Sequence, residues 1–517
     1  MCRYLCNSKL HVLQIKRKLL GHIQMLSLIL IWVLIVMICY QYRRRNIVLL
    51  GSKLPGPKGH PIIGHALMFY GKPEKAFKKF NQLSKQFKEI IALWIGPQLH
   101  VVILCAKYTE IILKNSRSTV KSEEYQFLKS WLGDSILISE GAKFRRNKKL
   151  LTPSFHVLNL KQYTHVFGEY AQKLNCDLEE KANGEEFDIH PFLSLTTMYV
   201  LLETSLGVKT ETLGVDALDY AEAVERLGRC AHQRVYKVWL RFNAIFRFSK
   251  LRQTQEKYLK VVHPLTERVI AERKKSYLNG DSDERSWPLF IDGFFKARDE
   301  QGQGLSDQEI KDEVMTMMFA GQDTTTVSVG FALSLLGLNP DIQDKLVMEI
   351  DKVFGDSERA LDYEDCKNLP YMEQVIQETW RLYPPIPLMG KMPTEDIQLD
   401  EYTLPKGCTI AVMIMKVHRD PSQYPRPNVF DPDNFLPERI KQRSPYSFIP
   451  FSAGHRTCIG QRYAMLLIKV LLANILRRYT VTSTVPMKEF QLAAQTTLKR
   501  KDGFRIRLRK RHIETIH

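Results

Sequence analysis

The feature that most constrains this chain is a glycine-flanked cysteine, Cys458, with Gly454 and Gly460 on either side of it. Glycine permits turns and close backbone approaches that other residues resist. Arg456 places a fixed positive charge two residues from the sulfur, which favours a thiolate over a thiol. An apolar run that begins at Tyr463 predicts a buried helix whose first N–H groups lie near the sulfur. Although a lone cysteine is usually an inert core residue, this pattern predicts a turn that presents an anionic sulfur, either as an axial metal ligand or as a nucleophile.

The spacing around the cysteine resembles the haem-binding loop of the cytochrome P450 superfamily. The matching positions are Phe451, Gly454, Arg456, Cys458 and Gly460. The resemblance implies that Cys458 is the axial ligand of a haem iron, that the other four residues help to bind the haem, and that Arg456 neutralises a propionate. It also implies the P450 fold, which is mainly α with a smaller β-rich subdomain, preceded here by an N-terminal membrane helix.

Charge and composition narrow the class of partner. The net charge is +19 and the pI about 9.4, values that fit nucleic acid, an anionic membrane or an acidic protein. The sequence has no zinc-finger spacing and no RNA-recognition motif, so we expect no nucleic-acid partner. The nine cysteines are scattered without CxxC pairs, which favours free thiols in a reducing compartment.

An apolar stretch near the N-terminus predicts a membrane anchor. Ile23–Tyr40 is apolar except for Gln24 and Ser27, and its 18 residues just reach the length of a spanning helix. The tri-arginine sequence 43–45 follows, where a cleaved signal peptide would have a small-residue cleavage site. We therefore expect a retained anchor. The predicted organisation is a non-native extension over 1–24, the anchor over 25–42, a basic and proline-rich linker over 43–61, and a haem-thiolate monooxygenase domain over 62–517.

The orientation of the anchor depends on where the natural chain starts. Positive charges lie on both sides of the apolar stretch, so the positive-inside rule does not decide. A start at Met25 would remove the conflict, and we expect residues 1–24 to derive from an upstream start codon or gene model. The catalytic domain would then face the cytoplasm from the endoplasmic reticulum membrane. N-terminal sequencing tests this, and a mature chain that begins at Met1 would contradict it.

A long helix is predicted between Ser306 and Leu338. Ser306 and Glu309 form a capping-box pattern, and Asn339-Pro340 ends the run. In its middle, the sequence 320–325 contains a glycine and polar residues that are unusual in an apolar helix. Such a break either makes room for a ligand or is only a kink with hydroxyl groups bonded back to the helix.

That central segment resembles the oxygen-activation motif of the same superfamily. The resemblance implies catalytic roles for Thr324, which can hydrogen-bond a water or a bound oxygen species, and for Asp323, which can carry protons inward. The helix and the body of the chain look most like the microsomal family 4 branch, insect-like, a group of fatty-acid ω-hydroxylases. That branch commonly has a glutamate, which can form an ester to the haem, where this chain has Ala320. We therefore expect non-covalently bound haem b.

Three further contacts follow from the resemblance. Glu378 and Arg381, with Arg439 from a Pro-Glu-Arg sequence, match a structural charge triad behind the haem loop. Lys391 stands where the family often has an arginine that binds a propionate. Lys148 stands at another propionate position, one turn after Phe144, which replaces a tryptophan and cannot donate a hydrogen bond.

Two hairpins are predicted from turn signals. One has strands 90–95 and 99–104 around Gly96-Pro97-Gln98, and the other turns at Asp502-Gly503. Beyond the second turn, apolar residues alternate with arginines at 504–509, so one strand face is apolar and the other basic.

The predicted function is that of a membrane-anchored haem-thiolate monooxygenase. It would insert one oxygen atom from O2 into a hydrophobic substrate, which we expect to be a fatty acid, another lipid or a xenobiotic. Electrons would come from NADPH through NADPH-cytochrome P450 reductase, with cytochrome b5 as a second donor, and an acidic docking surface would suit the basic cluster 143–149. The alternatives are a haem-thiolate isomerase or dehydratase and a non-catalytic haem- or lipid-binding relative.

Overall fold

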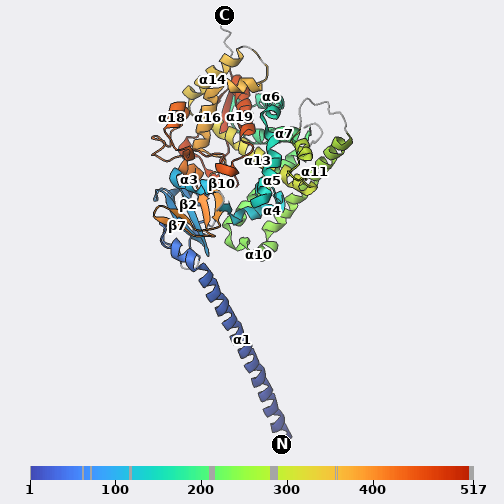
Figure 1. The fold of residues 1–517 in the computed structure, drawn as a ribbon, viewed down its shortest axis with the longest axis vertical. Coiled ribbons are helices and arrows are strands. Elements are labelled where there is room, and N and C mark those ends of the chain that lie inside the picture. Colours follow the sequence, from blue (N-terminus) through green and yellow to red (C-terminus); the bar gives the residue numbers. More distant parts are fainter. Residues whose placement is uncertain are drawn as a thin grey trace.

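Helices form most of the molecule, and the strands Gln98–Ile103 (β2) and Tyr402–Leu404 (β7) lie toward the end where the N-terminal helix leaves it (Figure 1). This computed structural model describes residues 2–60, 63–69, 71, 73–115, 119–208, 216–279, 289–355, 357 and 359–511. The helices are α1 (Cys2–Gly51), α2 (Pro73–Leu83), α3 (Ala106–Lys114), α4 (Lys129–Leu132), α5 (Gly141–Leu151), α6 (Val157–Glu179), α7 (His190–Leu206), α9 (Asp216–Tyr236), α10 (Asn243–Arg247), α11 (Lys250–Asn279), α12 (Phe290–Lys296), α13 (Asp307–Leu336), α14 (Pro340–Phe354), α15 (Tyr363–Lys367), α16 (Pro370–Leu382), α17 (Ile414–Val417), α18 (Pro437–Lys441) and α19 (Gln461–Arg478).

The strands form one larger sheet and three smaller ones. The five-stranded sheet has the order β1-β2-β8-β5-β3, with β2 and β8 parallel. A three-stranded sheet has the order β4-β12-β9, and β6-β7 and β10-β11 are two-stranded. The strands are β1 (Ile90–Ile95), β2 (Gln98–Ile103), β3 (Thr119–Lys121), β4 (Asn183–Asp188), β5 (Met389–Pro393), β6 (Ile397–Leu399), β7 (Tyr402–Leu404), β8 (Thr409–Val412), β9 (Tyr479–Thr482), β10 (Leu492–Ala494), β11 (Leu498–Arg500) and β12 (Arg505–Lys510).

The first predicted hairpin is confirmed. Strands β1 and β2 are antiparallel, with Ile95 opposite Gln98. Gly96 between them has φ +58°, a left-handed conformation that glycine adopts without strain. The second hairpin prediction is wrong, since β12 pairs with β4 and β9 while β11 pairs with β10. The apolar alternation before and within β12 is confirmed, because residues 504, 506 and 508 are buried while the arginines between them are exposed.

Helix α1 projects away from the globule (Figure 1). Its segment Gln24–Gly51 is long and apolar enough to cross a membrane, and none of its most apolar window is buried against the protein. The helix continues through the arginines to Gly51, so the first part of the expected linker is helical. Near its end, Asn46 donates a hydrogen bond to Asp396 at 3.1 Å, and Ile47 packs on a core beside β6 and β7. Residues 61 and 62, where we placed the boundary of the catalytic domain, lie outside the described residues.

Helix α13 crosses the core, as predicted. Ser306 caps it, and its side chain and that of Glu309 form the reciprocal hydrogen bonds of a capping box. The helix ends at Leu336, two residues before the expected position, and α14 begins at Pro340. It packs against α7, α16 and α19. No helical turn is lost over 320–325, so the expected break is absent, and Gly321 instead allows close packing on Leu201.

Candidate functional site

The cysteine loop is closed by its own backbone. The N–H of Cys458 donates to the carbonyl of Phe451 at 3.0 Å. Gly454 has φ +73°, and a side chain there would approach the carbonyl oxygen of Leu113 at 3.0 Å, so both conformation and space require glycine. Gly460 differs, since an added Cβ would meet only ordinary contacts, 3.9 Å from the sulfur. Phe451 packs edge-on against Trp380 with ring centroids 4.9 Å apart, which fixes the loop on α16.

The Cys458 side chain is exposed, yet the pKa of its thiol is raised by burial among protein atoms. The backbone N–H of Gly460 and the Lys148 ammonium act in the opposite direction and lower the pKa. These two observations agree if the sulfur faces an internal cavity, where it is accessible but poorly solvated. A cationic metal would favour the thiolate at such a position, because a coordinating thiol is deprotonated.

The middle of α13 supports an internal opening. Ala320 is exposed although the helix crosses the core, and its neighbours Met318 and Gln322 are 1% and 4% exposed. The hydroxyl of Thr324 donates to the Ala320 carbonyl at 2.7 Å. One turn further, Ser328 accepts a hydrogen bond from the Trp380 ring nitrogen at 2.9 Å. Since Trp380 also contacts Phe451, one chain of contacts connects α13 to the cysteine loop.

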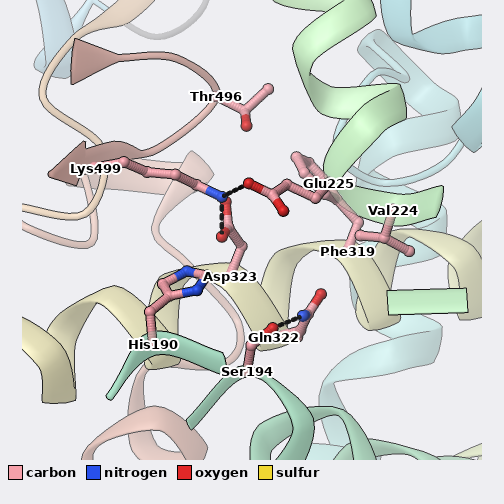
Figure 2. A pocket seen from close by; sticks show the side chains of 9 residues that line it. All are labelled: His190, Ser194, Val224, Glu225, Phe319, Gln322, Asp323, Thr496 and Lys499. Atoms are coloured by element: carbon pink, nitrogen blue, oxygen red, sulfur yellow. Dashed lines mark hydrogen bonds and ion pairs between the residues drawn. The ribbon is translucent and has the colours of Figure 1, made fainter. Parts of the chain in front are cut away.

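The side chain of Asp323 does not share the hydrogen-bond partner of Thr324, which is the Ala320 carbonyl. Its two carboxylate oxygens receive hydrogen bonds from Lys499, at 2.9 Å, and from the Thr497 hydroxyl, at 2.6 Å. Figure 2 shows the carboxylate directed at Lys499 of β11. Consecutive helical residues project about 100° apart, so the side chains of Thr324 and Asp323 leave α13 in different but adjacent directions.

Three cationic side chains converge beside the cysteine loop: Arg456, Lys391 and Lys121. Lys121 and Lys391 are directly opposite one another on β3 and β5. The pKa of Lys121 is lowered to about 7, first by burial and then by the Arg456 charge. The pKa of Lys391 is also lowered to about 7, by burial and by the charges of Lys121 and Arg456. Among the described residues, neither ammonium forms an ion pair, and Glu140 is the one acidic group that raises either pKa. Such a cluster fits two carboxylates of a ligand. Sequence reasoning missed Lys121, which only the strand pairing brings here.

Phe144 and Lys148 have roles other than the expected ones. The Arg456 guanidinium lies 3.5 Å from the Phe144 ring centroid, so the phenyl ring supports this arginine by a cation–π contact. Arg456 also donates to the carbonyl of Ser139 at 2.7 Å. The Lys148 ammonium bonds to carbonyls of the cysteine loop, those of His455 and Thr457. We therefore assign Lys148 to the support of this loop rather than to a propionate.

Glu378 and Arg381 form a bidentate ion pair at 2.6 and 2.7 Å, and both side chains are fully buried. Their third partner is not Arg439, and that prediction is wrong. Arg439 lies 3.5 Å from Asp431 with its side chain 47% exposed, because α18 is on the surface. Asn434, which precedes α18, instead donates to Glu378 at 3.3 Å. Arg381 also donates to three backbone carbonyls, those of His418, Pro427 and Val429.

The basic cluster on α5 is largely neutralised within the chain. Lys143 pairs with Asp134 at 2.9 Å, and Lys149 with Glu300 at 2.6 Å. Arg146 pairs with Asp299 and lies near Glu309. An acidic partner that docked there would compete with these carboxylates, so the cluster is less basic than its sequence implies.

These features fit a haem group. The sulfur of Cys458 can ligate the iron, the opening at Ala320 leaves space over α13, and the cations Arg456, Lys391 and Lys121 match two propionates. A cysteine thiolate is one of the axial ligands by which proteins hold haem iron, and cationic side chains pair with carboxylates such as the propionates. No group of three or more His, Cys, Asp or Glu side chains that could hold a separate metal ion occurs among the described residues.

Comparison with known proteins agrees with this geometry. The cytochrome P450 family model matches residues 54–505. The chain is 34% identical to cytochrome P450 4g15 of Drosophila melanogaster, over 92% of this chain and 95% of that protein. It is 34% identical to human cytochrome P450 4V2, over 88% of this chain and 89% of that protein. The crystal structure of a cytochrome P450DA mutant haem domain has the same fold, with a TM-score of 0.76 and 22% identity over 89% of this chain and 98% of that one. The chain therefore belongs to the cytochrome P450 family, and it is a haem-binding P450 monooxygenase that is similar to family 4 enzymes.

Proposed function

We propose that this P450 hydroxylates a lipid-like substrate, a fatty acid, another lipid or a xenobiotic, with electrons from NADPH. The observation that carries the proposal is the pairing of the Cys458 loop with the opening at Ala320 and Thr324 on α13. Bound at that place, the haem would supply the activation of O2 and the transfer of one oxygen atom into a C–H bond.

The chain's own residues would divide the remaining work. Cys458 would hold the iron through its sulfur. Arg456, Lys391 and Lys121 would neutralise the propionates and so orient the cofactor. The Thr324 hydroxyl, which donates its own proton to the Ala320 carbonyl, would accept a hydrogen bond beside the reacting oxygen. Asp323 would take up and release the protons that reduction of O2 to water requires. Phe451 and Trp380 would hold the loop against α16 through their edge-on contact.

Access from a membrane supports a hydrophobic substrate. α1 leaves the globule at the end where α10 also lies (Figure 1). At that end Phe242, Ile245 and Phe248 are exposed apolar side chains, 61%, 48% and 86% exposed. A membrane of the endoplasmic reticulum, with the globule on the cytoplasmic side, would present lipid-soluble molecules to this surface.

The chain needs an external source of electrons. The sequence contains no nicotinamide- or flavin-binding motif, so we propose NADPH-cytochrome P450 reductase as the donor and cytochrome b5 as a second donor. The intact Thr324 segment disfavours an isomerase or dehydratase, because such branches often alter it.

A labelled-oxygen experiment tests the proposal. The full chain, reconstituted with reductase and lipid, is supplied with NADPH, isotopically labelled O2 and a panel of fatty acids, hydrocarbons and terpenoids. We expect product that carries one labelled oxygen atom and depends on NADPH. Rearranged product without label would support an isomerase, and a bound substrate without turnover would support a non-catalytic relative.

Non-covalent attachment of the haem is a separate proposal, supported by Ala320. A methyl side chain cannot form an ester to the haem. Acid–solvent extraction followed by mass spectrometry should release all haem from the wild-type polypeptide. Haem retained on the chain would contradict the proposal, and an Ala320→Glu variant is the positive control for ester formation.

A further inference from the structure

A small polar pocket lies beside α13, around the carboxylate of Asp323 (Figure 2). It has room for about one water molecule. The side chains around it come from α7, α9, α13 and the β10–β11 connection with β11. Among them are His190, Glu225, Asp323 and Lys499.

Lys499 is shared between two carboxylates in this pocket. Its ammonium lies 2.9 Å from Asp323 and 3.3 Å from Glu225 of α9. The Lys499 side chain is 11% exposed, whereas that of Glu225 is 31% exposed, so the network reaches from the core to the surface. Glu225 has a second cation, Arg229, at 2.6 Å. Asp323 therefore has its ion pair with Lys499, whereas Glu225 pairs with both Lys499 and Arg229.

The charges agree with this arrangement. Burial tends to lower the pKa of Lys499, but Asp323 and Glu225 outweigh it and raise that pKa. Burial tends to raise the pKa of Glu225, but Lys499 and Arg229 lower it to about 2. A lysine with a raised pKa keeps its proton, so it can hold a carboxylate in place without itself acting as the proton donor.

His190 gives the pocket a polar atom that still needs a partner. Its Nε2 is buried and has no hydrogen-bond partner among the described residues. The ring is stacked on Phe504, with 7° between the planes, and so is fixed in orientation. Burial and the Lys499 charge lower the pKa of His190, which favours a neutral ring that can exchange a hydrogen bond with water. A buried polar atom beside a water-sized space is the usual setting of an internal water.

We infer that Lys499 is a positioning residue: it holds the Asp323 carboxylate against the pocket at His190, and the protons used at Thr324 enter through this pocket. This inference rests on the proposed function, because it concerns the protons of the same reaction. A proton from solvent enters at the Glu225 edge, and the pocket water takes it up as it gives one of its own protons to the Asp323 carboxylate, which becomes a carboxylic acid. Asp323 then passes the proton toward Thr324 and returns to the carboxylate. Lys499 keeps its own protons throughout.

The first test measures the pair without turnover. Thermal unfolding is compared for wild type, Lys499→Met, Asp323→Asn and the double variant. If Lys499 holds Asp323, the effects of the two substitutions are not additive, because each alone already removes the contact. Additive effects would overturn the assignment whatever reaction the enzyme catalyses.

The second test measures coupling, which is the share of the NADPH electrons that forms product rather than hydrogen peroxide. With wild type and Lys499→Met, product and hydrogen peroxide are quantified per NADPH consumed over a pH series. We expect the product-to-peroxide ratio to fall by roughly tenfold to a hundredfold in Lys499→Met, as for a misplaced catalytic group. We also expect its pH profile to shift, because Asp323, Glu225 and Asp188, which raise the pKa of His190, would then act on that ring without the opposing charge of Lys499. Lys499→Arg should restore much of the ratio.

Matched variants separate the positioning of Asp323 by Lys499 from a general loss of folding stability. Lys501→Met removes a lysine two residues along, which pairs with Glu74 at 3.2 Å outside the pocket, and it should keep the wild-type ratio and pH profile. Thr497→Val removes only the hydroxyl bonded to Asp323, and it should lower the ratio even if Lys499→Met folds poorly. Wild-type ratios and profiles in both Lys499→Met and Thr497→Val would overturn the inference. Failure of the proposed function would show differently, as the absence of NADPH-dependent product from the wild type.

Discussion

Lys121 and Lys391 are cross-strand partners on β3 and β5, and they place two ammonium groups side by side without an ion-paired carboxylate among the described residues. Like charges directly opposite one another destabilise a sheet. Such a pair is expected where a ligand supplies the missing negative charge. We interpret the pair, with Arg456, as the place of the haem propionates.

This pair predicts how haem affinity depends on pH. The pKa of each lysine is about 7 in the folded chain and 10.5 ordinarily, so without haem the unfolded chain binds more protons between these values and folding stability rises with pH. The negative charges of bound propionates favour the protonated form of both lysines, so haem binding raises the pKa of each. Haem affinity should therefore be greatest below pH 7 and fall as the pH rises above it, because binding then requires proton uptake.

Absorbance titrations of the haem-free chain over a pH series would measure this effect. Lys391→Met should bind haem more weakly and with a flatter pH dependence. Lys107→Met, which removes a surface lysine paired with Asp400, should behave as wild type. The same affinity at every pH in the wild type would refute the assignment.

The buried pair Glu378–Arg381 predicts a graded series of variants. Arg381→Ala leaves Glu378 unpaired in the core, so we expect a loss of about 3–5 kcal/mol in the free energy of unfolding and no bound haem. Asn434→Ala removes one hydrogen bond to a charged group and should cost about 1.5–3 kcal/mol. Arg439→Ala changes an exposed side chain and should stay within about 0.5 kcal/mol of wild type.

Haem content and chemical unfolding of the purified variants give this order directly. If Arg439→Ala lost haem as Arg381→Ala does, the exchange of Arg439 for Asn434 as third partner would be mistaken.

The buried carboxyl group of Glu313 predicts that folding stability falls as the pH rises, which is opposite to the effect of the two lysines. This buried carboxyl accepts hydrogen bonds from the Ile136 N–H at 2.9 Å and from the Asn147 amide at 3.1 Å. Burial raises its pKa to about 7 from 4.5, so the folded chain binds more protons between these values. The stability that the protonated form provides is therefore present below pH 4.5 and is lost as the pH rises through 7, a change of about 3 kcal/mol.

Urea unfolding at several pH values, compared between wild type and Glu313→Gln, isolates this contribution. The difference in free energy of unfolding between the two should grow in favour of the variant as the pH rises from 4.5 to 7, and it should level off above 7. Glu300→Gln, at an exposed ion pair with Lys149, is the control. A difference that does not vary with pH would show that Glu313 does not titrate there.

Phe144 predicts a contribution from packing at the propionate site. Its ring supports Arg456 at 3.5 Å, and a partly desolvated contact of this kind contributes on the order of 1–2 kcal/mol. Phe144→Ala should lower haem content, whereas Phe144→Trp should preserve it. Haem content equal to wild type in both variants would show that the ring does not position the arginine.

Local signals predicted the parts of the site that lie within one segment. The glycine at position 454, the Ser306 cap and the β1–β2 turn each follow from a few neighbouring residues, and each is confirmed. The sequence could not reveal Lys121 beside Lys391, or Lys499 beside Asp323, because strand pairing and helix packing bring together residues far apart in the chain. The assignment of Arg439 failed for a related reason: its motif matched by residue type, but the short 3-10 turn Pro432–Phe435 places Asn434 at Glu378 instead.

The thiolate ligand is the central claim, and a reduced carbon monoxide difference spectrum of the full chain tests it most directly. Ligation by Cys458 predicts the red-shifted Soret band of a thiolate-bound haem, and Cys458→His should lose that band while it still binds haem. A wild-type spectrum without the red-shifted band, or one that Cys458→His leaves unchanged, would contradict the account.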